Sequence, residues 1–205
     1  MLMQRLYISA PSVARLIRKE REGERVLEGY FPDHAHRSTF VQITETGSSL
    51  ILEAGDRTSE ERADLPLAHA QALLAVSQGR VEYVRTKLSI GSHEIQALHV
   101  VRPGPLDLVS ITVTPEDGRD LPPLPWFGPE VSAEPAHQRR RLALNGAPTA
   151  LETEFTNAAL NSLLDLLEDR FTTWPGPHEV ARSDAPAAAA IPHGCSCAGA
   201  GERRG

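Results

Sequence analysis

Apolar and polar residues alternate with a period of two along several segments of residues 1–114, which is typical of β-strands with one buried face. Turn signals such as Thr46-Gly47-Ser48 and Gly91-Ser92 separate some of these segments. The pattern predicts strands over residues 2–9, 25–31, 38–44, 49–54, 80–90, 93–101 and 106–114. A meander of this kind with few helices predicts an α+β fold, in which an antiparallel β-barrel or tunnel of about eight strands carries flanking helices.

Two helices are predicted among these strands. Ser12 is suited to cap a short amphipathic helix that runs to Arg18. Residues 65–79 fit a second helix, because Pro66 is compatible with a first helical turn and Gly79 with a C-cap. Both helices are short enough to lie against a small barrel.

A third helix is predicted over residues 149–171, where Thr149 and Glu152 have the spacing of a capping box. Apolar residues recur there at every fourth position: Leu151, Phe155, Ala159, Leu163 and Leu167. A face of this width favours packing against the barrel over binding of a partner helix.

The 205 residues are predicted to form one domain over residues 1–178 and a tail over residues 179–205. No apolar run approaches the roughly 18 residues that a membrane-spanning helix requires. The N-terminal segment lacks the continuous apolar core of a signal peptide. The net charge of −6 provides no general attraction to nucleic acid. These features predict a cytoplasmic protein with neither nucleic acid nor a membrane as a partner.

The tail is rich in alanine and glycine and is predicted to be disordered, because it has too little apolar bulk to offset chain entropy. It contains the chain's two cysteines, Cys195 and Cys197, together with His193. In an extended segment these three side chains face the same way. Two thiolates and an imidazole would suit Cu(I) or Zn(II). The thiols could instead form a disulfide or become oxidised.

Another hypothesis treats the tail as a substrate. The small, glycine-rich segment around Cys195, Ser196 and Cys197 resembles in composition the core of ribosomally made peptides that a partner enzyme modifies. The domain would then be a large folded leader that a tail-modifying enzyme recognises. The remaining alternative is a tail without function that carries incidental cysteines.

The most specific motif is PWFGPEVSAEPAHQRRRLALNG over residues 125–146, a Pro-Trp-apolar-Gly turn followed by Glu-Val and a basic Leu-Ala helix. Upstream, VEYVRTKLSIGSHEIQALHVVRPGPLDLVSITV over residues 81–113 supplies a basic strand and two further strands. In this order, the segments resemble the second half of a CYTH domain, the triphosphate tunnel fold. The resemblance implies a barrel whose interior binds phosphate groups through basic side chains and a divalent metal.

The resemblance also implies that several charged positions of the family are altered in this chain. The Glu-x-Glu-x-Lys motif of the family's first strand aligns with Leu2, Gln4 and Leu6. The paired carboxylates of a later strand align with Ser110 and Thr112. Because a divalent cation needs several oxygen ligands, usually carboxylates, the barrel is predicted to hold no metal.

The basic positions of the family are altered in part. Two inward arginines align with Phe40 and Gln42, and the lysine of the following strand aligns with Glu53. Phosphoryl transfer needs a metal and a basic clamp, and neither requirement is met by this pattern.

Three charged positions of the family are retained, as Arg85, Lys87 and Glu130. They are the predicted residues of a residual anion site in the tunnel. The run of arginines at 139–141 is typical of a solvated helix face, although beside Arg85 and Lys87 it could add to anion affinity.

The preferred hypothesis is therefore a catalytically inactive CYTH-like binding or scaffold domain that presents its cysteine-containing tail. The alternative is a divalent-metal-dependent triphosphate or polyphosphate hydrolase, or an anion-binding protein, with a site around the three retained residues. Both hypotheses allow a phosphate-containing ligand.

Overall fold

The computed structural model describes residues 3–32, 37–54, 59–113, 121–149, 153, 155–171 and 173–175. Within these ranges, eight strands form one sheet in which all neighbours are antiparallel, in the order β1-β8-β7-β6-β2-β3-β4-β5. The strands are β1 (Met3–Ile8), β2 (Glu24–Tyr30), β3 (Arg37–Ile43), β4 (Ser48–Ala54), β5 (Glu60–Asp64), β6 (Gly79–Ile90), β7 (His93–Arg102) and β8 (Leu106–Val113). The predicted antiparallel meander is confirmed.

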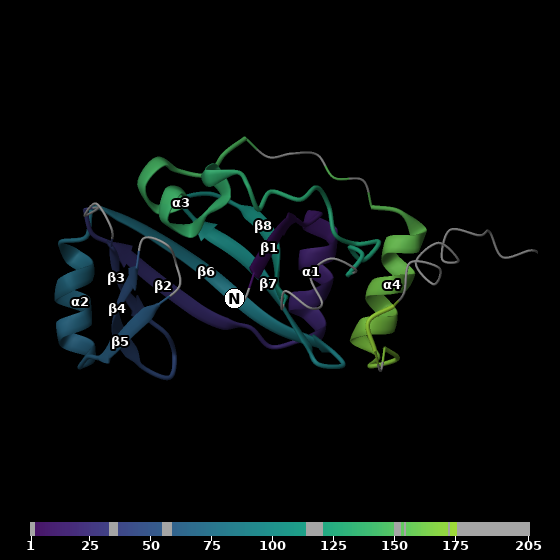
Figure 1. Cartoon of the computed structure of the whole chain (residues 1–205), viewed down its shortest axis with the longest axis horizontal. Coiled ribbons are helices and arrows are strands. Elements are labelled where there is room, and N and C mark those ends of the chain that lie inside the picture. The colour runs from purple at the N-terminus through teal and green to yellow at the C-terminus, as the bar shows by residue number, and fades with distance from the viewer. Residues whose placement is uncertain are drawn as a thin grey trace, which may run out of the picture.

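Four α-helices and one 3-10 helix accompany the sheet in the described part of the chain (Figure 1). They are α1 (Pro11–Glu20), α2 (Leu67–Ala75), η1 (Pro135–His137), α3 (Arg139–Asn145) and α4 (Asn157–Leu167). None of the described helices is long and apolar enough to cross a membrane.

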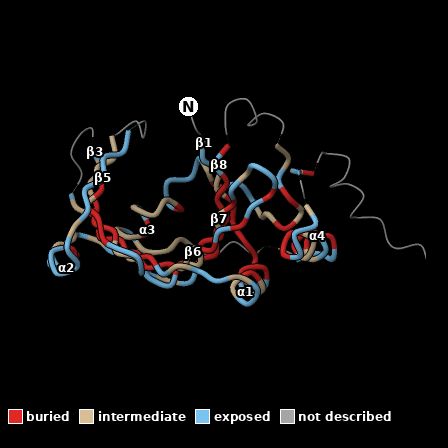
Figure 2. Tube along the Cα trace, turned by 90° about the horizontal axis from the view of Figure 1, so that it is seen from below, coloured by how far each residue is buried: buried red, intermediate tan, exposed pale blue. Residues whose placement is uncertain are grey.

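The sheet is curved into a trough and does not close into a barrel (Figure 2). Its two edge strands, β1 and β5, do not pair with each other. The free side of β1 is instead covered by the chain around Pro129, whose carbonyl accepts from the Ile8 amide over 3.0 Å. The other edge, β5, is fully exposed and carries four charged residues in the sequence EERAD, a composition that discourages further strand pairing. The sequence pattern does not predict β5, because its residues do not alternate between apolar and polar.

Apolar side chains form a buried cluster on each face of the sheet. The concave face holds one cluster of buried residues that includes Tyr83, Leu108 and Leu142, the last of these from α3 inside the trough (Figure 2). The convex face holds a second cluster to which α1 and α4 contribute, with Ile17 and Leu163 completely buried. The third helix of the sequence prediction therefore packs into the core as favoured.

The helix ends differ from those predicted. α1 begins at Pro11 after Ala10, with no side-chain cap, so Ser12 is not its cap. A proline at the first helical position needs no amide partner, which explains this start. α4 begins after Thr156, whose side chain accepts from the Ala159 amide, so the prediction of Thr149 as the cap is wrong. It also ends at Leu167, earlier than predicted.

Gly79 does not cap α2, which ends at Ala75 with Val76 as its C-cap, but begins strand β6. A side chain at this position would place its Cβ only 2.3 Å from the Ala143 carbonyl oxygen on α3. The glycine is therefore needed because α3 lies directly against the strand.

The close approach gives a first prediction. Gly79→Ala is expected to destabilise the protein by roughly 1–3 kcal/mol, because the α3 backbone must shift to admit the methyl group. Gly47→Ala is the matched control, since a Cβ at that position meets nothing within 4 Å. Urea unfolding of the two variants measures the difference, and equal effects would show that α3 does not constrain the β6 start.

Candidate functional site

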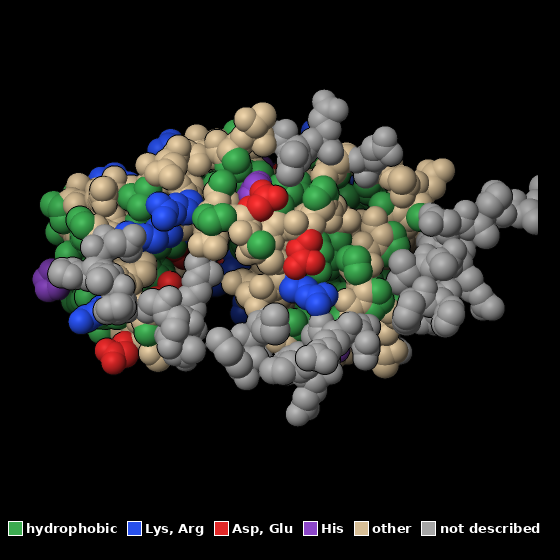
Figure 3. All heavy atoms as spheres, turned by 45° about the horizontal axis from the view of Figure 1, so that its top comes forward, with side chains coloured by type: hydrophobic (Ala, Val, Ile, Leu, Met, Phe, Trp, Pro, Cys, Tyr) green, Lys and Arg blue, Asp and Glu red, His purple; other side chains and the backbone are tan. Residues whose placement is uncertain are grey.

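Polar side chains are gathered in the middle of the concave face, where alternation along the strands turns them into the trough. They line two adjoining cavities of about 460 Å³ and 200 Å³. The two cavities share three lining residues, Gln42, Arg62 and Arg85. A hollow with basic side chains on its walls opens on the face turned to the viewer in Figure 3.

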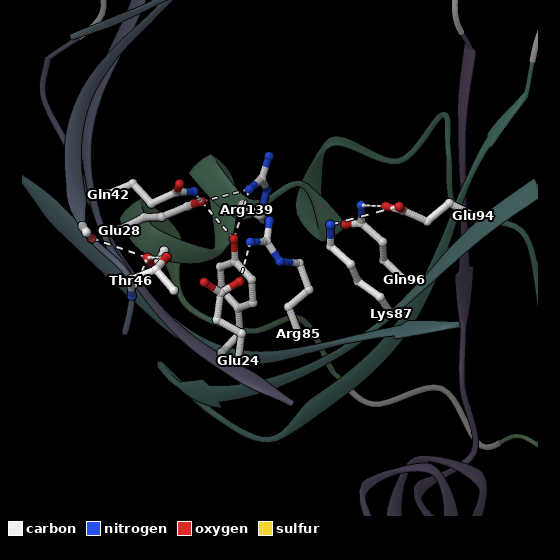
Figure 4. A network of polar contacts seen from close by, with 12 residues as sticks. Glu24, Glu28, Gln42, Thr46, Arg85, Lys87, Glu94, Gln96 and Arg139 are labelled. Atoms are coloured by element: carbon white, nitrogen blue, oxygen red, sulfur yellow. Dashed lines mark hydrogen bonds and ion pairs between the residues drawn. The ribbon is translucent and has the colours of Figure 1, made fainter. Parts of the chain in front are cut away.

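Glu28, on β2, is the centre of the polar network in the trough (Figure 4). Its side chain is completely buried, and its carboxylate accepts hydrogen bonds from four groups. The donors are Tyr30 Oη at 2.7 Å, Tyr83 Oη at 2.8 Å, Gln42 Nε2 at 3.0 Å and Arg139 Nη1 at 2.7 Å. This number of donors satisfies a carboxylate that would otherwise be costly to bury.

Arg139 reaches this carboxylate from α3, on the open side of the trough (Figure 4). The negative charge of Glu28 raises the pKa of Arg139 well above its ordinary value, against the opposing effect of burial. Burial, followed by the Glu28 charge, raises the pKa of Tyr30, and burial likewise raises the pKa of Tyr83. Both phenols therefore stay protonated and keep donating.

The network extends across the trough through Gln42. Its Nε2 donates to Glu28, while its Oε1 accepts from Arg62 Nη2 on β5 over 3.4 Å. Arg62 also lies 3.6 Å from Glu60 in a largely exposed pair. Side chains from β2, β3, β5, β6 and α3 are thus connected in one polar chain.

Arg85, on β6, lies between the two cavities and pairs with Glu24 on β2. Its Nη2 donates to Glu24 Oε2 over 2.5 Å. This hydrogen bond lowers the pKa of Glu24, which stays ionised at neutral pH. The Arg85 Nε is buried and has no acceptor among the described residues. An arginine nitrogen can only donate, and the Arg85 side chain lines both cavities.

The other residues of the predicted anion site lie apart from this centre. Lys87 is on the same face of β6, but it is mainly exposed and lies 3.9 Å from Glu94. Glu130 forms an isolated bridge with Tyr7 beyond the β1 edge, where its carboxylate accepts from Ser132 Oγ over 2.7 Å. It does not line either of the two cavities described.

The altered family positions on β1 and β8 form neutral contacts. Gln4 Nε2 donates to Ser110 Oγ over 2.9 Å, so these two side chains satisfy each other across the strand pair. Leu6 packs against the concave apolar cluster, and Thr112 is exposed. Leu2 lies outside the described residues.

Of the remaining altered positions, Phe40 is buried beside Tyr30, with ring centroids 4.9 Å apart. Gln42 belongs to the Glu28 network. Glu53 lies on β4 opposite Glu60 of β5.

The metal that the tunnel fold implies does not fit these residues. Glu28 has its oxygens occupied by four donors, and Glu24 is held by Arg85. In the part of the chain that the structure describes, no three side chains of the His, Cys, Asp and Glu types come together as a metal-binding group. Since divalent cations take several oxygen ligands, this donor set is poorly suited to hold one.

The residues proposed for the tail, His193, Cys195, Ser196 and Cys197, lie outside the described residues. Their modification, their binding of Cu(I) or Zn(II), and the tail-modifying enzyme remain predictions.

Sequence reasoning missed Glu24, Glu28 and Arg62 as site residues, and it named Arg139 only within an arginine run that could add to anion affinity. A signal for one of them is present, because Glu28 interrupts the apolar pattern of the strand RVLEGYF at a position that shares a face with Val26 and Tyr30. The expectation that the arginine run is solvated holds for Arg141, which is exposed, but is wrong for Arg139.

No protein-family model matches the sequence, and no curated protein is significantly similar to it. Solved structures do match. The crystal structure of the inorganic triphosphatase NE1496 is similar at a TM-score of 0.56 and 17% identity, over 72% of this chain and 97% of that protein. A second crystal structure of NE1496, described as a hypothetical protein, is similar at a TM-score of 0.55 and 18% identity, over 71% of this chain and 99% of that protein. The chain therefore has a CYTH-like triphosphate tunnel fold, with the tunnel present as an open trough.

Proposed function

We propose that the domain binds a small phosphate-containing ligand in the trough and does not hydrolyse it. The observation that carries this proposal is the set of arginines on the cavity walls, because Arg62 and Arg85 line both cavities and Arg139 lines the smaller one. The planar guanidinium group of arginine presents several N–H donors that match the geometry of a phosphate group.

Arg139 supports the same proposal. Both of its described hydrogen bonds, to Glu28 and to Tyr83 Oη, come from Nη1. Its guanidinium also lines the smaller cavity. Because Glu28 and Tyr83 fix the plane of this group, its remaining donors are held in place for an anion.

The charge of the site argues against a highly charged ligand. The walls and the network contain three guanidinium groups, Arg62, Arg85 and Arg139, and four carboxylates, Glu24, Glu28, Glu60 and Asp64. A triphosphate would bring several negative charges into a site that already holds more acids than bases. Without the metal and the excess of basic groups that phosphoryl transfer requires, binding is favoured over hydrolysis.

Calorimetric titration of the purified chain with orthophosphate, pyrophosphate and tripolyphosphate tests this proposal. We expect the chain to bind orthophosphate or pyrophosphate at one site. Arg85→Gln should weaken this binding at least tenfold, because a hydrogen bond to a charged group contributes roughly 1.5–3 kcal/mol. Arg80→Gln is the matched control, because Arg80 lies on the same strand and donates to the Ala75 carbonyl outside the cavities.

Phosphate release from tripolyphosphate with Mg²⁺ or Mn²⁺ is expected to stay at background. Metal-dependent release that Glu130→Gln abolishes would overturn the non-hydrolytic part of the proposal. Absence of binding to any of the three anions at millimolar concentration would overturn the binding part. Circular dichroism of each variant separates a loss of binding from a loss of folding.

A further inference from the structure

The larger cavity differs in chemistry from the smaller one. It extends from Arg85 toward the β3–β4 turn and β5. Its wall carries two carboxylates, Glu24 and Asp64, together with hydroxyl groups such as those of Thr44 and Ser49. None of the described residues that line it has an aromatic ring. This surface is suited to groups that donate hydrogen bonds.

The two carboxylates belong to opposite parts of the wall, because Glu24 is on β2 and Asp64 on β5, with β3 and β4 between them in the sheet. Glu24 uses Oε2 to bind Arg85, and Asp64 uses Oδ1 to accept from Ser49 Oγ over 3.2 Å. Glu24 also accepts a side-chain hydrogen bond from Thr44, whereas the second oxygen of Asp64 lies outside the contact with Ser49. Both carboxylates belong to side chains that line a cavity of about 460 Å³, which exceeds the space that a phosphate group needs.

The charges on this wall balance, since Glu24 and Asp64 oppose Arg62 and Arg85. A simple phosphate dianion would neutralise the positive charge of the arginines, but the two carboxylates would repel it. A ligand that carries both signs of charge matches both pairs.

We infer that the ligand is a small phosphorylated primary amine, with its phosphate toward Arg85 and Arg139 and its ammonium group toward Asp64. This inference rests on the proposed function and specifies its ligand class. A primary ammonium has three N–H donors for carboxylate and hydroxyl oxygens. A quaternary ammonium is typically recognised by aromatic faces, which this cavity lacks. A nucleobase would likewise find no aromatic side chain for stacking in this cavity.

Two probes of similar size test the inference by calorimetry: O-phosphoethanolamine and ethyl phosphate, which differ in the terminal ammonium group. We expect O-phosphoethanolamine to bind at least tenfold more tightly. In Asp64→Asn, this preference should fall at least fivefold while the affinity for ethyl phosphate stays within twofold. Glu61→Gln is the matched control, because Glu61 is an exposed acid on the same strand that does not line either described cavity.

The outcomes distinguish the inference from the proposed function. Equal affinity for both probes would overturn the ammonium site and leave phosphate binding intact. Binding of phosphocholine as tight as that of O-phosphoethanolamine would overturn the choice of a primary amine. A parallel loss of both probes in Asp64→Asn, with folding intact, would also overturn the inference. Binding of neither probe or of inorganic phosphate by the unmodified chain would overturn the proposed function itself.

Discussion

Arg139→Met is expected to lower the free energy of unfolding by about 3 kcal/mol, at the lower end of the roughly 3–5 kcal/mol for breaking a buried ion pair. The reason is that Glu28 is completely buried and would keep its negative charge without a cationic partner. The effect stays at the lower end because Tyr30, Tyr83 and Gln42 continue to donate to this carboxylate. Urea unfolding at neutral pH measures the change.

Arg141→Met is the control for this substitution, since Arg141 is exposed on the same helix and should change stability by no more than about 0.5 kcal/mol. Adding Glu28→Gln to Arg139→Met is expected to recover part of the loss, because the neutral amide removes the buried charge. Equal effects of Arg139→Met and Arg141→Met would show that the Glu28 contact does not hold α3 over the trough.

Leu163→Ala is expected to destabilise the protein by roughly 2–5 kcal/mol, the usual range for removing a buried leucine side chain. Leu163 is completely buried in the convex cluster, together with Ile17 of α1 and Ile95 of β7. Asn161→Ala is the control, since Asn161 is exposed on the same helix. Chemical unfolding monitored by circular dichroism gives both values. If the two substitutions have the same small effect, α4 is an appended helix and does not complete the core.

Local periodicity accounts for much of the fold. Each strand predicted from alternation is present within a few residues of its predicted ends, because a strand with one buried face leaves this pattern in its own sequence. β5 was missed for the same reason, since a fully exposed edge strand has no buried face to pattern. The ends of α1 and α4 depend on single capping residues, which are less specific than a periodic run.

The candidate site was predicted only in part. Arg85 was found through the resemblance of its strand to a CYTH domain, and it does line the cavities. The acidic residues of the site were not predicted, because the charged positions of the CYTH family align with other residues of this chain, such as Leu6 and Ser110. Charged groups are present in the trough, but on β2, β5 and α3, where the family pattern did not place them.

The sequence by itself determined most of the strand and helix segments, the two-faced character of the sheet and the tunnel-like fold class, because these depend on residues close together in the chain. Only the tertiary structure decided that the sheet stays open and that Glu28 meets Arg139, which is 111 positions away. The pairing depends on the order of the strands, on their register and on the path of α3 over the trough. A charged residue carries no local signal of its partner, so the same arginine run that suggests a solvated helix supplies the cation for a buried carboxylate.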